Sequence, residues 1–154
     1  MAEGRYEAAL GQVLELTVLL NGDMTESLAR DGLTVSRTTL LWELRQRGPS
    51  TQRVLADALR VSARTITGLV DGLVATGFVT REAHPTDRRA ALVTFTAHGL
   101  RTVEELERGQ RELAADLFAA MPAARFDCFV EGLGHVLARL RAHGLSHQIK
   151  EESA

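Results

Sequence analysis

Residues 85–96 read PTDRRAALVTFT. It begins with proline, threonine and aspartate, which favour a turn, and it continues from Ala91 to Thr96 with the β-branched and aromatic residues typical of a strand. Two adjacent arginines, Arg88 and Arg89, stand where the turn meets the strand. The stretch therefore predicts a β-hairpin that carries two guanidinium groups near its tip.

The other strand of this hairpin is predicted at residues 78–81, with residues 82–89 as the loop. Arginines on such a loop can reach the minor groove of DNA, where the negative potential attracts them. Asp87 could pair with a neighbouring arginine and hold the loop in shape, or it could act through turn chemistry alone. Asp71 is a second candidate partner for an arginine.

Residues 51–79, just upstream, predict a helix-turn-helix. Gly48-Pro49 ends the preceding helix, Ser50 can cap the first helix of the motif, and Ser62 can cap the second. The second helix has apolar residues at positions i, i+3, i+4 and i+7, which are Ile66, Leu69, Val70 and Leu73.

The outward face of this second helix is suited to reading DNA. At about 100° per residue, Arg64, Gly68 and Asp71 lie opposite Ile66. Arg64 could pair with a guanine edge, and a threonine could touch a thymine methyl or a phosphate. An ordinary solvated helix is the alternative, and the arginine hairpin favours the DNA-reading interpretation. The predicted DNA-contacting residues are Ser50, Thr51, Ser62, Arg64, Thr65, Thr67, Gly68, Arg88 and Arg89.

Long helices are expected on both sides of this region, at residues 6–29, 97–120 and 122–143. Their apolar faces, which include Phe126 to Leu140 in the last helix, have no partner within the chain, and this predicts a homodimer. The expected fold is mainly α (α+β), a winged helix-turn-helix with a small β-hairpin wing and long terminal dimerisation helices. The expected regions are 1–32 for the N-terminal dimerisation helix, 33–96 for the winged region, 97–146 for the C-terminal dimerisation helices, and 147–154 for a frayed tail.

The charge distribution supports nucleic-acid binding in spite of a net charge of −2. Residues 37–101 hold 10 arginines against 5 acidic residues, a net charge of +5. The segments before and after carry net charges of −4 and −3. A basic middle between acidic ends confines the attraction for DNA to one segment, although chance segregation on solvated helix faces is the alternative.

Several other classes of function lack their sequence signals. The chain of 154 residues has neither a spanning apolar run nor a signal peptide, so a cytoplasmic protein with no membrane contact is expected. The histidines lack partners at metal-ligand spacing, and neither a phosphate-binding loop nor a nucleophile elbow is present. We therefore expect no catalytic residues, no metal, no cofactor and no enzyme. The single cysteine, Cys128, is expected to be a buried structural thiol, with redox sensing as the alternative.

Taken together, these residues resemble the MarR family of winged helix-turn-helix regulators along nearly the whole chain. Asp87, Arg89, Val93, Thr96 and Gly99 fall where the wing signature of that family expects them. Further landmarks are Leu33-Thr34, Gly48-Pro49-Ser50-Thr51, Leu55-Ala56, Val61-Ser62 and Leu69-Val70-Asp71. The resemblance implies a homodimer that binds a palindromic double-stranded DNA operator, usually represses, and releases DNA on oxidation or on binding a small aromatic or phenolic ligand.

The resemblance also implies a ligand pocket between the dimer helices and the winged region, for which Arg37, Leu41 and Trp42 are the candidates; Trp42 as a core residue is the alternative. The chain departs from the family pattern at Gly68 and Gly72, where many members carry Arg or Lys. Two exposed glycines would weaken the helix by about 1 kcal/mol each relative to alanine. They keep open a different class of function, a ligand- or protein-binding helical dimer that has lost DNA binding.

Overall fold

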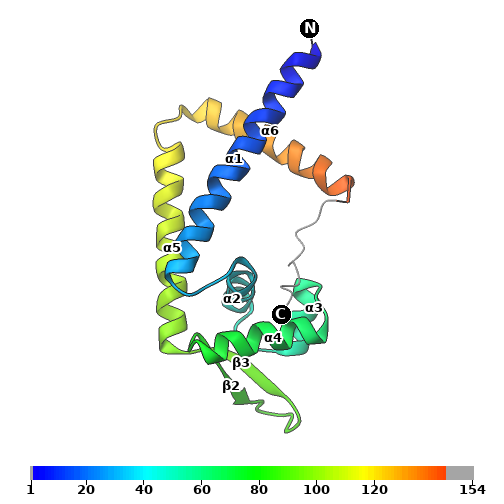
Figure 1. Cartoon of the computed structure of the whole chain (residues 1–154), viewed down its shortest axis with the longest axis vertical. Coiled ribbons are helices and arrows are strands. Elements are labelled where there is room, and N and C mark those ends of the chain that lie inside the picture. Colours follow the sequence, from blue (N-terminus) through cyan, green and yellow to red (C-terminus); the bar gives the residue numbers. More distant parts are fainter. Residues whose placement is uncertain (1, 145–154) are drawn as a thin grey trace.

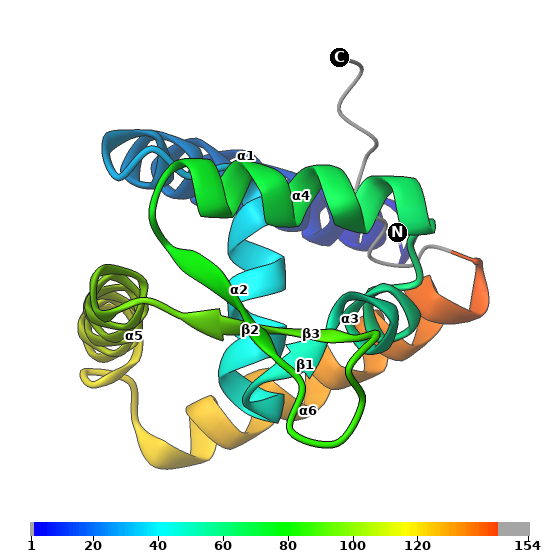
Figure 2. The same cartoon turned by 90° about the horizontal axis from the view of Figure 1, so that it is seen from below.

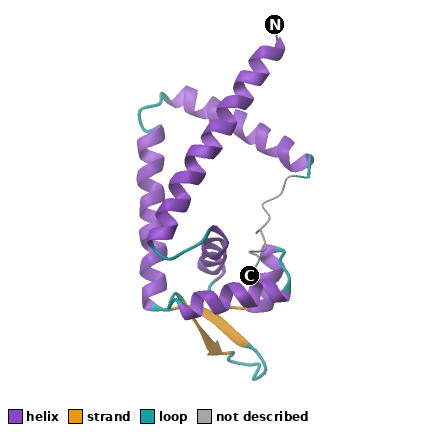
Figure 3. Cartoon of the chain, in the orientation of Figure 1, coloured by secondary structure: helices purple, strands orange, loops and turns teal. Residues whose placement is uncertain are grey.

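The computed structural model describes residues 2–144, which form six α-helices and three short strands (Figure 1). The elements in chain order are α1 (Ala2–Arg30), α2 (Val35–Arg47), β1 (Ser50–Thr51), α3 (Gln52–Leu59), α4 (Ala63–Ala75), β2 (Val79–Ala83), β3 (Ala91–Phe95), α5 (Ala97–Phe118) and α6 (Ala123–Ala142). The predicted fold class is confirmed: the described chain is mainly helical, with one small antiparallel sheet (Figure 3).

The sheet has three strands in the order β1-β3-β2. The predicted hairpin is confirmed, with Val79 opposite Phe95 and Ala83 opposite Ala91. The third strand was not predicted: Ser50 and Thr51 pair with Val93 and Leu92 on the other edge of β3. The sheet therefore joins the start of the helix-turn-helix to the wing.

Side-chain caps set the helix starts. Ser62, a predicted cap, accepts a hydrogen bond from the backbone N–H of Thr65, and Thr34 and Thr96 accept from those of Arg37 and Gly99. The prediction for α3 is wrong by one residue, because Thr51 is the cap and accepts from Val54. Ser50 is instead drawn into β1, where its hydroxyl donates to the Gly48 carbonyl oxygen at 2.9 Å.

One apolar core lies inside the winged region. It contains Leu40, Leu41 and Leu44 of α2, Leu55 of α3 and the predicted inner face of α4. Val93 adds the centre of the sheet, and Leu28 and Val103 add the adjoining ends of α1 and α5. Of the long helices, only the end of α1 near Leu28 and the start of α5 near Val103 contribute buried side chains to this core.

The long helices extend away from this core, and α4 and the β2–β3 hairpin form the opposite end of the molecule (Figures 1 and 2). Helix α6 has no fully buried side chain: Phe126 and Leu133 are half-buried, and the rest of its predicted apolar face is exposed in a single copy. The large apolar side chains exposed on α1, α5 and α6 include Tyr6, Leu10, Leu14, Val18, Leu19, Met24, Leu113, Leu117, Phe129, Val130, Val136, Leu137 and Leu140.

Gly99 allows α5 to approach the sheet closely. A Cβ atom at this position would lie 1.8 Å from the carbonyl oxygen of Phe78. The same carbonyl accepts from the backbone N–H of Thr96 at 3.1 Å, and the ring of His98 lies 4.8 Å from that of Phe78. Only glycine leaves room for this junction between the wing and α5.

Candidate nucleic-acid interface

Helix α4 presents its predicted outward face to solvent. Ile66, Leu69, Val70 and Leu73 are buried, whereas Arg64, Thr67 and Gly68 are exposed. Ser62 closes the N-terminus: its hydroxyl oxygen accepts from the backbone N–H of Thr65 at 3.0 Å and lies 2.8 Å from the Thr65 hydroxyl. A capped, exposed helix end with one arginine is the geometry that major-groove readers use.

The two residues before α3 are placed differently from each other. Thr51 is half-buried, and its hydroxyl oxygen accepts from the backbone N–H of Val54 at 3.3 Å. Ser50 is buried, and its hydroxyl donates inward to Gly48. Ser50 therefore lacks the exposed hydroxyl that a contact with a phosphate needs.

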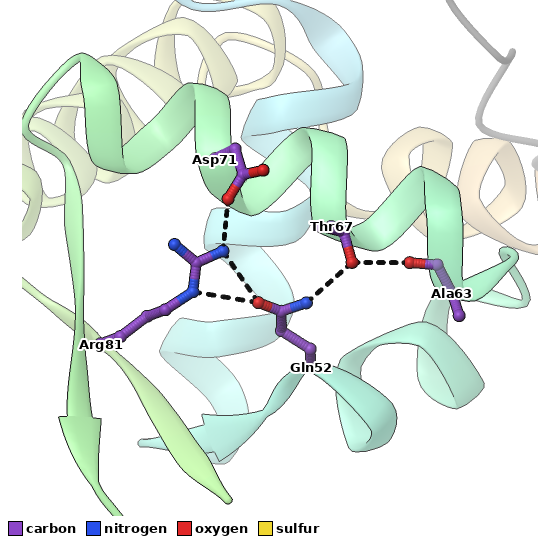
Figure 4. Close-up of polar contacts among 5 residues, drawn as sticks. All are labelled: Gln52, Ala63, Thr67, Asp71 and Arg81. Carbon is purple, nitrogen blue, oxygen red and sulfur yellow. Dashed lines mark hydrogen bonds and ion pairs between the residues drawn. The ribbon is translucent and has the colours of Figure 1, made fainter.

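A chain of polar side chains joins α3, α4 and β2 on the outer surface (Figure 4). The Asp71 carboxylate accepts from Nη2 of Arg81 at 2.5 Å. The Gln52 amide oxygen accepts from Nη2 and Nε of the same guanidinium at 2.9 and 3.1 Å. The Gln52 amide nitrogen donates to the Thr67 hydroxyl at 3.0 Å, and that hydroxyl donates to the Ala63 carbonyl oxygen at 2.8 Å.

Asp71 thus lies against an arginine, and its partner is Arg81 of β2. Neither Gln52 nor Arg81 was predicted to belong to the site. Arg81 is 29 residues from Gln52, and only the fold brings these side chains together. The period-2 pattern of β2 places Arg81 in a strand, but the pattern carries no information on what it faces.

The wing tip is held by hydrogen bonds from backbone N–H groups to side chains. Nδ1 of His84 accepts from the N–H groups of Thr86 and Asp87 at 3.2 and 3.1 Å. The Asp87 carboxylate accepts from the N–H of Arg89 at 2.9 Å. Asp87 therefore follows turn chemistry; the three ion pairs in residues 2–144 do not include it, so its expected pairing with an arginine is wrong for this structure. Arg88 and Arg89 are exposed.

The two glycines of α4 differ. A Cβ atom on Gly68 would meet nothing within 4 Å, as expected for an exposed position. A Cβ atom on Gly72 would lie 2.6 Å from Nη2 and 2.9 Å from Cζ of Arg37. The expectation that Gly72 is exposed is wrong, because the guanidinium of Arg37 lies over it and uses the space that a side chain would fill.

The three candidate ligand-pocket residues lie on α2 but in different environments. Leu41 is fully buried in the core, and Trp42 is half-buried and packs against the core. Arg37 is half-buried beside Gly72. Leu41 therefore has no surface left for a ligand, whereas Arg37 and Trp42 are both partly exposed.

Cys128 is exposed on α6, so the expectation of a buried thiol is wrong for the single chain. Its exposure follows from the lack of any buried side chain on α6. Within residues 2–144, no three His, Cys, Asp or Glu side chains gather as metal ligands would. No helix in this range combines the length and apolar character needed to cross a bilayer.

These elements define a winged helix-turn-helix protein. Residues 33–91 match the model of the MarR family. The HTH-type transcriptional repressor YetL of Bacillus subtilis is 34% identical over 86 residues, which cover 56% of this chain and 52% of YetL. This chain therefore spans about half the length of that relative. An HTH-type transcriptional regulator of Mycobacterium tuberculosis, MT0903.1, is 28% identical over 122 residues, 79% of this chain and 85% of its own.

Solved structures agree with this assignment. The crystal structure of RV1404 from M. tuberculosis superposes with a TM-score of 0.73 at 25% identity, covering 86% of this chain and 92% of that one. YusO from B. subtilis has a TM-score of 0.73 at 20% identity, covering 92% of this chain and 98% of that one, and it shows the fold alone. Residues 33–91 therefore match the MarR family, and the described chain is similar to HTH-type transcriptional regulators in sequence and to winged-helix structures in fold.

Proposed function

We propose that the chain binds a palindromic operator in double-stranded DNA as a homodimer. The observation that carries this proposal is the position of the exposed arginines. Arg64 lies at the capped end of α4, and Arg88 and Arg89 lie at the tip of the wing. Both elements occupy the end of the molecule opposite the long helices (Figure 1). In this proposal α4 enters the major groove and the wing enters the minor groove.

The DNA contacts divide between base edges and phosphates. Arg64 is assigned to a guanine edge and Arg89 to the minor groove, while Arg88 and the cap hydroxyls of Thr51 and Ser62 lie near phosphates. Thr65 and Thr67 are assigned to the bases under the first turn of α4, and Gly68 lets the helix backbone approach the DNA. Ser50 is not assigned to a DNA contact, because its hydroxyl is buried; its role is to pair with β3 as part of β1.

The exposed apolar faces of α1, α5 and α6 support the homodimer. Soluble proteins rarely leave so many large apolar side chains uncovered, and a second copy offers a matching surface. In the proposed domain division, residues 1–32 and 97–146 hold the dimer and residues 33–96 bind DNA. A twofold axis would place the two α4 helices about 34 Å apart, one turn of DNA.

Repression and ligand release complete the proposal. The relative YetL is named a transcriptional repressor, which supports repression here. Release by a small aromatic or phenolic ligand rests on the family resemblance. Arg37 is the side chain best placed to report such a ligand to α4, because its guanidinium lies against Gly72.

The test is an anisotropy titration with duplex DNA from upstream of the chain's own gene, at several salt concentrations and with unrelated DNA as competitor. Tight, competitor-resistant binding whose affinity falls steeply with salt is expected, because several phosphate contacts release counterions. The Arg89→Ala variant should bind this DNA more weakly while keeping its helical content and its mass in solution. Undiminished affinity in this variant would remove the wing arginine from the proposal.

A further inference from the structure

The Gln52 side chain makes three hydrogen bonds within the protein, and these bonds join three elements (Figure 4). It stands at the first position of α3, donates to Thr67 of α4, and accepts twice from Arg81 of β2. Together with Asp71, these side chains form what we call the Gln52 clamp: Gln52, Thr67, Asp71 and Arg81. A rotation of the wing relative to α4 would have to break the three bonds made by Arg81.

The clamp limits what Thr67 can offer to DNA. A hydroxyl has one proton to donate, and that of Thr67 goes to the Ala63 carbonyl oxygen at 2.8 Å. One of its lone pairs accepts from Gln52. Phosphate oxygens require donors, and Thr67 has none to give while its hydroxyl donates to Ala63. Its methyl group stays available for apolar contact with a thymine methyl.

Arg81 links the clamp to the wing itself. It pairs with Val93 in the β2–β3 register, so its backbone lies in the wing while its guanidinium lies against α4 and α3. Its Nη2 and Nε are held by the Gln52 oxygen and the Asp71 carboxylate. Charge-assisted bonds of this kind are among the stronger polar contacts in proteins.

We propose that Gln52 is a positioning residue for DNA recognition: it locks the wing to the recognition helix and holds Thr67 in place so that its methyl group reads a thymine methyl. This inference rests on the proposed function, because it assigns roles within the same DNA-binding surface. The wing arginines and the α4 side chains then engage DNA as one preorganised unit, which lowers the ordering cost of specific binding.

The first arm of the test needs no DNA. Amide hydrogen exchange of β2 and β3 is measured in the wild type, in Gln52→Ala and in Gln46→Ala, where Gln46 is an exposed glutamine of α2. The clamp predicts exchange about fivefold faster in the wing strands of Gln52→Ala, and wild-type exchange in Gln46→Ala. Equal exchange in all three proteins would overturn the proposal, whether or not the chain binds DNA.

The second arm is a double-mutant cycle with Gln52→Ala and Arg81→Ala. Binding is measured on a site selected by the wild type from a random duplex library, and also on unrelated DNA. Gln52→Ala should weaken the selected site about tenfold and add little in the Arg81→Ala background, because both changes open the same clamp. Its affinity for unrelated DNA and its melting temperature should stay close to those of the wild type. Additive losses, or equal losses on both DNAs, would contradict a positioning role.

Thr67 is tested on the same selected site. Replacing each thymine by deoxyuridine removes one methyl group at a time, and one such replacement should weaken the wild type about threefold. Thr67→Ser keeps the hydroxyl in the clamp and should be insensitive to that replacement. A wild type insensitive to every replacement would overturn the thymine-methyl role. A wild type that selects no site would instead refute the proposed function, and the exchange measurement would still decide on the clamp.

Discussion

The winged region buries its apolar side chains within one chain, whereas the long helices leave many of theirs exposed. Between α2 and the sheet, the large apolar residues are packed inside one chain, and Leu40, Leu41, Leu55, Val70 and Val93 are fully buried. On α6 the apolar side chains are as regularly spaced, yet none is buried. The difference shows which part of the molecule folds around itself and which part presents a surface for another molecule.

The largest effect is expected in the core of the winged region. Leu41→Ala removes a fully buried side chain and should lower the free energy of unfolding by about 3 kcal/mol. Leu137→Ala makes the same chemical change on the exposed face of α6 and serves as the matched variant. Chemical denaturation of both proteins under conditions that keep them monomeric checks this prediction. Equal losses would mean that α6 packs within its own chain.

A charge on the outer face of α6 should separate the two copies. Val130→Asp places a carboxylate among exposed apolar side chains, and a carboxylate buried at an apolar interface without a partner is costly. Light scattering should give the mass of one chain for this variant and of two chains for the wild type. Gln110→Asp, on an exposed polar position of α5, is the control and should leave the mass unchanged. A wild type that is already monomeric would contradict the proposed dimer.

The junction between the two regions is tested at Gly99. Alanine there would place its Cβ 1.8 Å from the Phe78 carbonyl oxygen, so α5 would have to shift, and we expect a loss of about 2 kcal/mol in stability. Gly109→Ala changes the same helix where nothing lies within 4 Å, and it should stabilise the protein by about 0.5 kcal/mol. Thermal melting should show a lower melting temperature for Gly99→Ala and a higher one for Gly109→Ala. A tolerated Gly99→Ala would show that the junction is looser than described.

The smallest effect is expected at the wing tip. Asn at position 84 can place its carbonyl oxygen where Nδ1 of His84 accepts from Thr86 and Asp87, whereas Gln offers a polar group only where Nε2 lies. His84→Asn should keep the DNA affinity close to that of the wild type. His84→Gln should weaken it by about 1 kcal/mol, because the loop that carries the arginines loses two bonds. The reverse order in an anisotropy titration would assign His84 to a phosphate contact instead.

The features predicted correctly from the sequence are those that depend on residues close together along the chain. The buried face of α4, the cap Ser62 and the pairing of the two hairpin strands were predicted correctly, although β2 ends at Ala83 and not at Arg81. Each depends on residues within one or two helical turns or on one tight turn. Such local patterns were enough to predict the fold class and the resemblance of residues 33–91 to the MarR family.

Features that join distant segments were missed. Ser50 was expected to cap α3, but pairing with Val93 draws it into a strand and leaves Thr51 as the cap. The contact of Gln52 with Arg81 spans 29 residues. Gly72 was read as exposed because its helical position gives no sign that Arg37 of α2 lies over it. The candidate site could be placed on the right elements, but its internal contacts follow from tertiary packing alone.

In the proposed function, the arginines of α4 and the wing read DNA while the long helices hold two copies together. Selection from a random duplex library, followed by sequencing of the bound DNA, tests both parts at once. A twofold dimer should enrich an inverted repeat whose half-site centres lie about one helical turn apart. Enrichment of a single half-site would contradict the dimer, and a library without enrichment would contradict DNA reading by this chain.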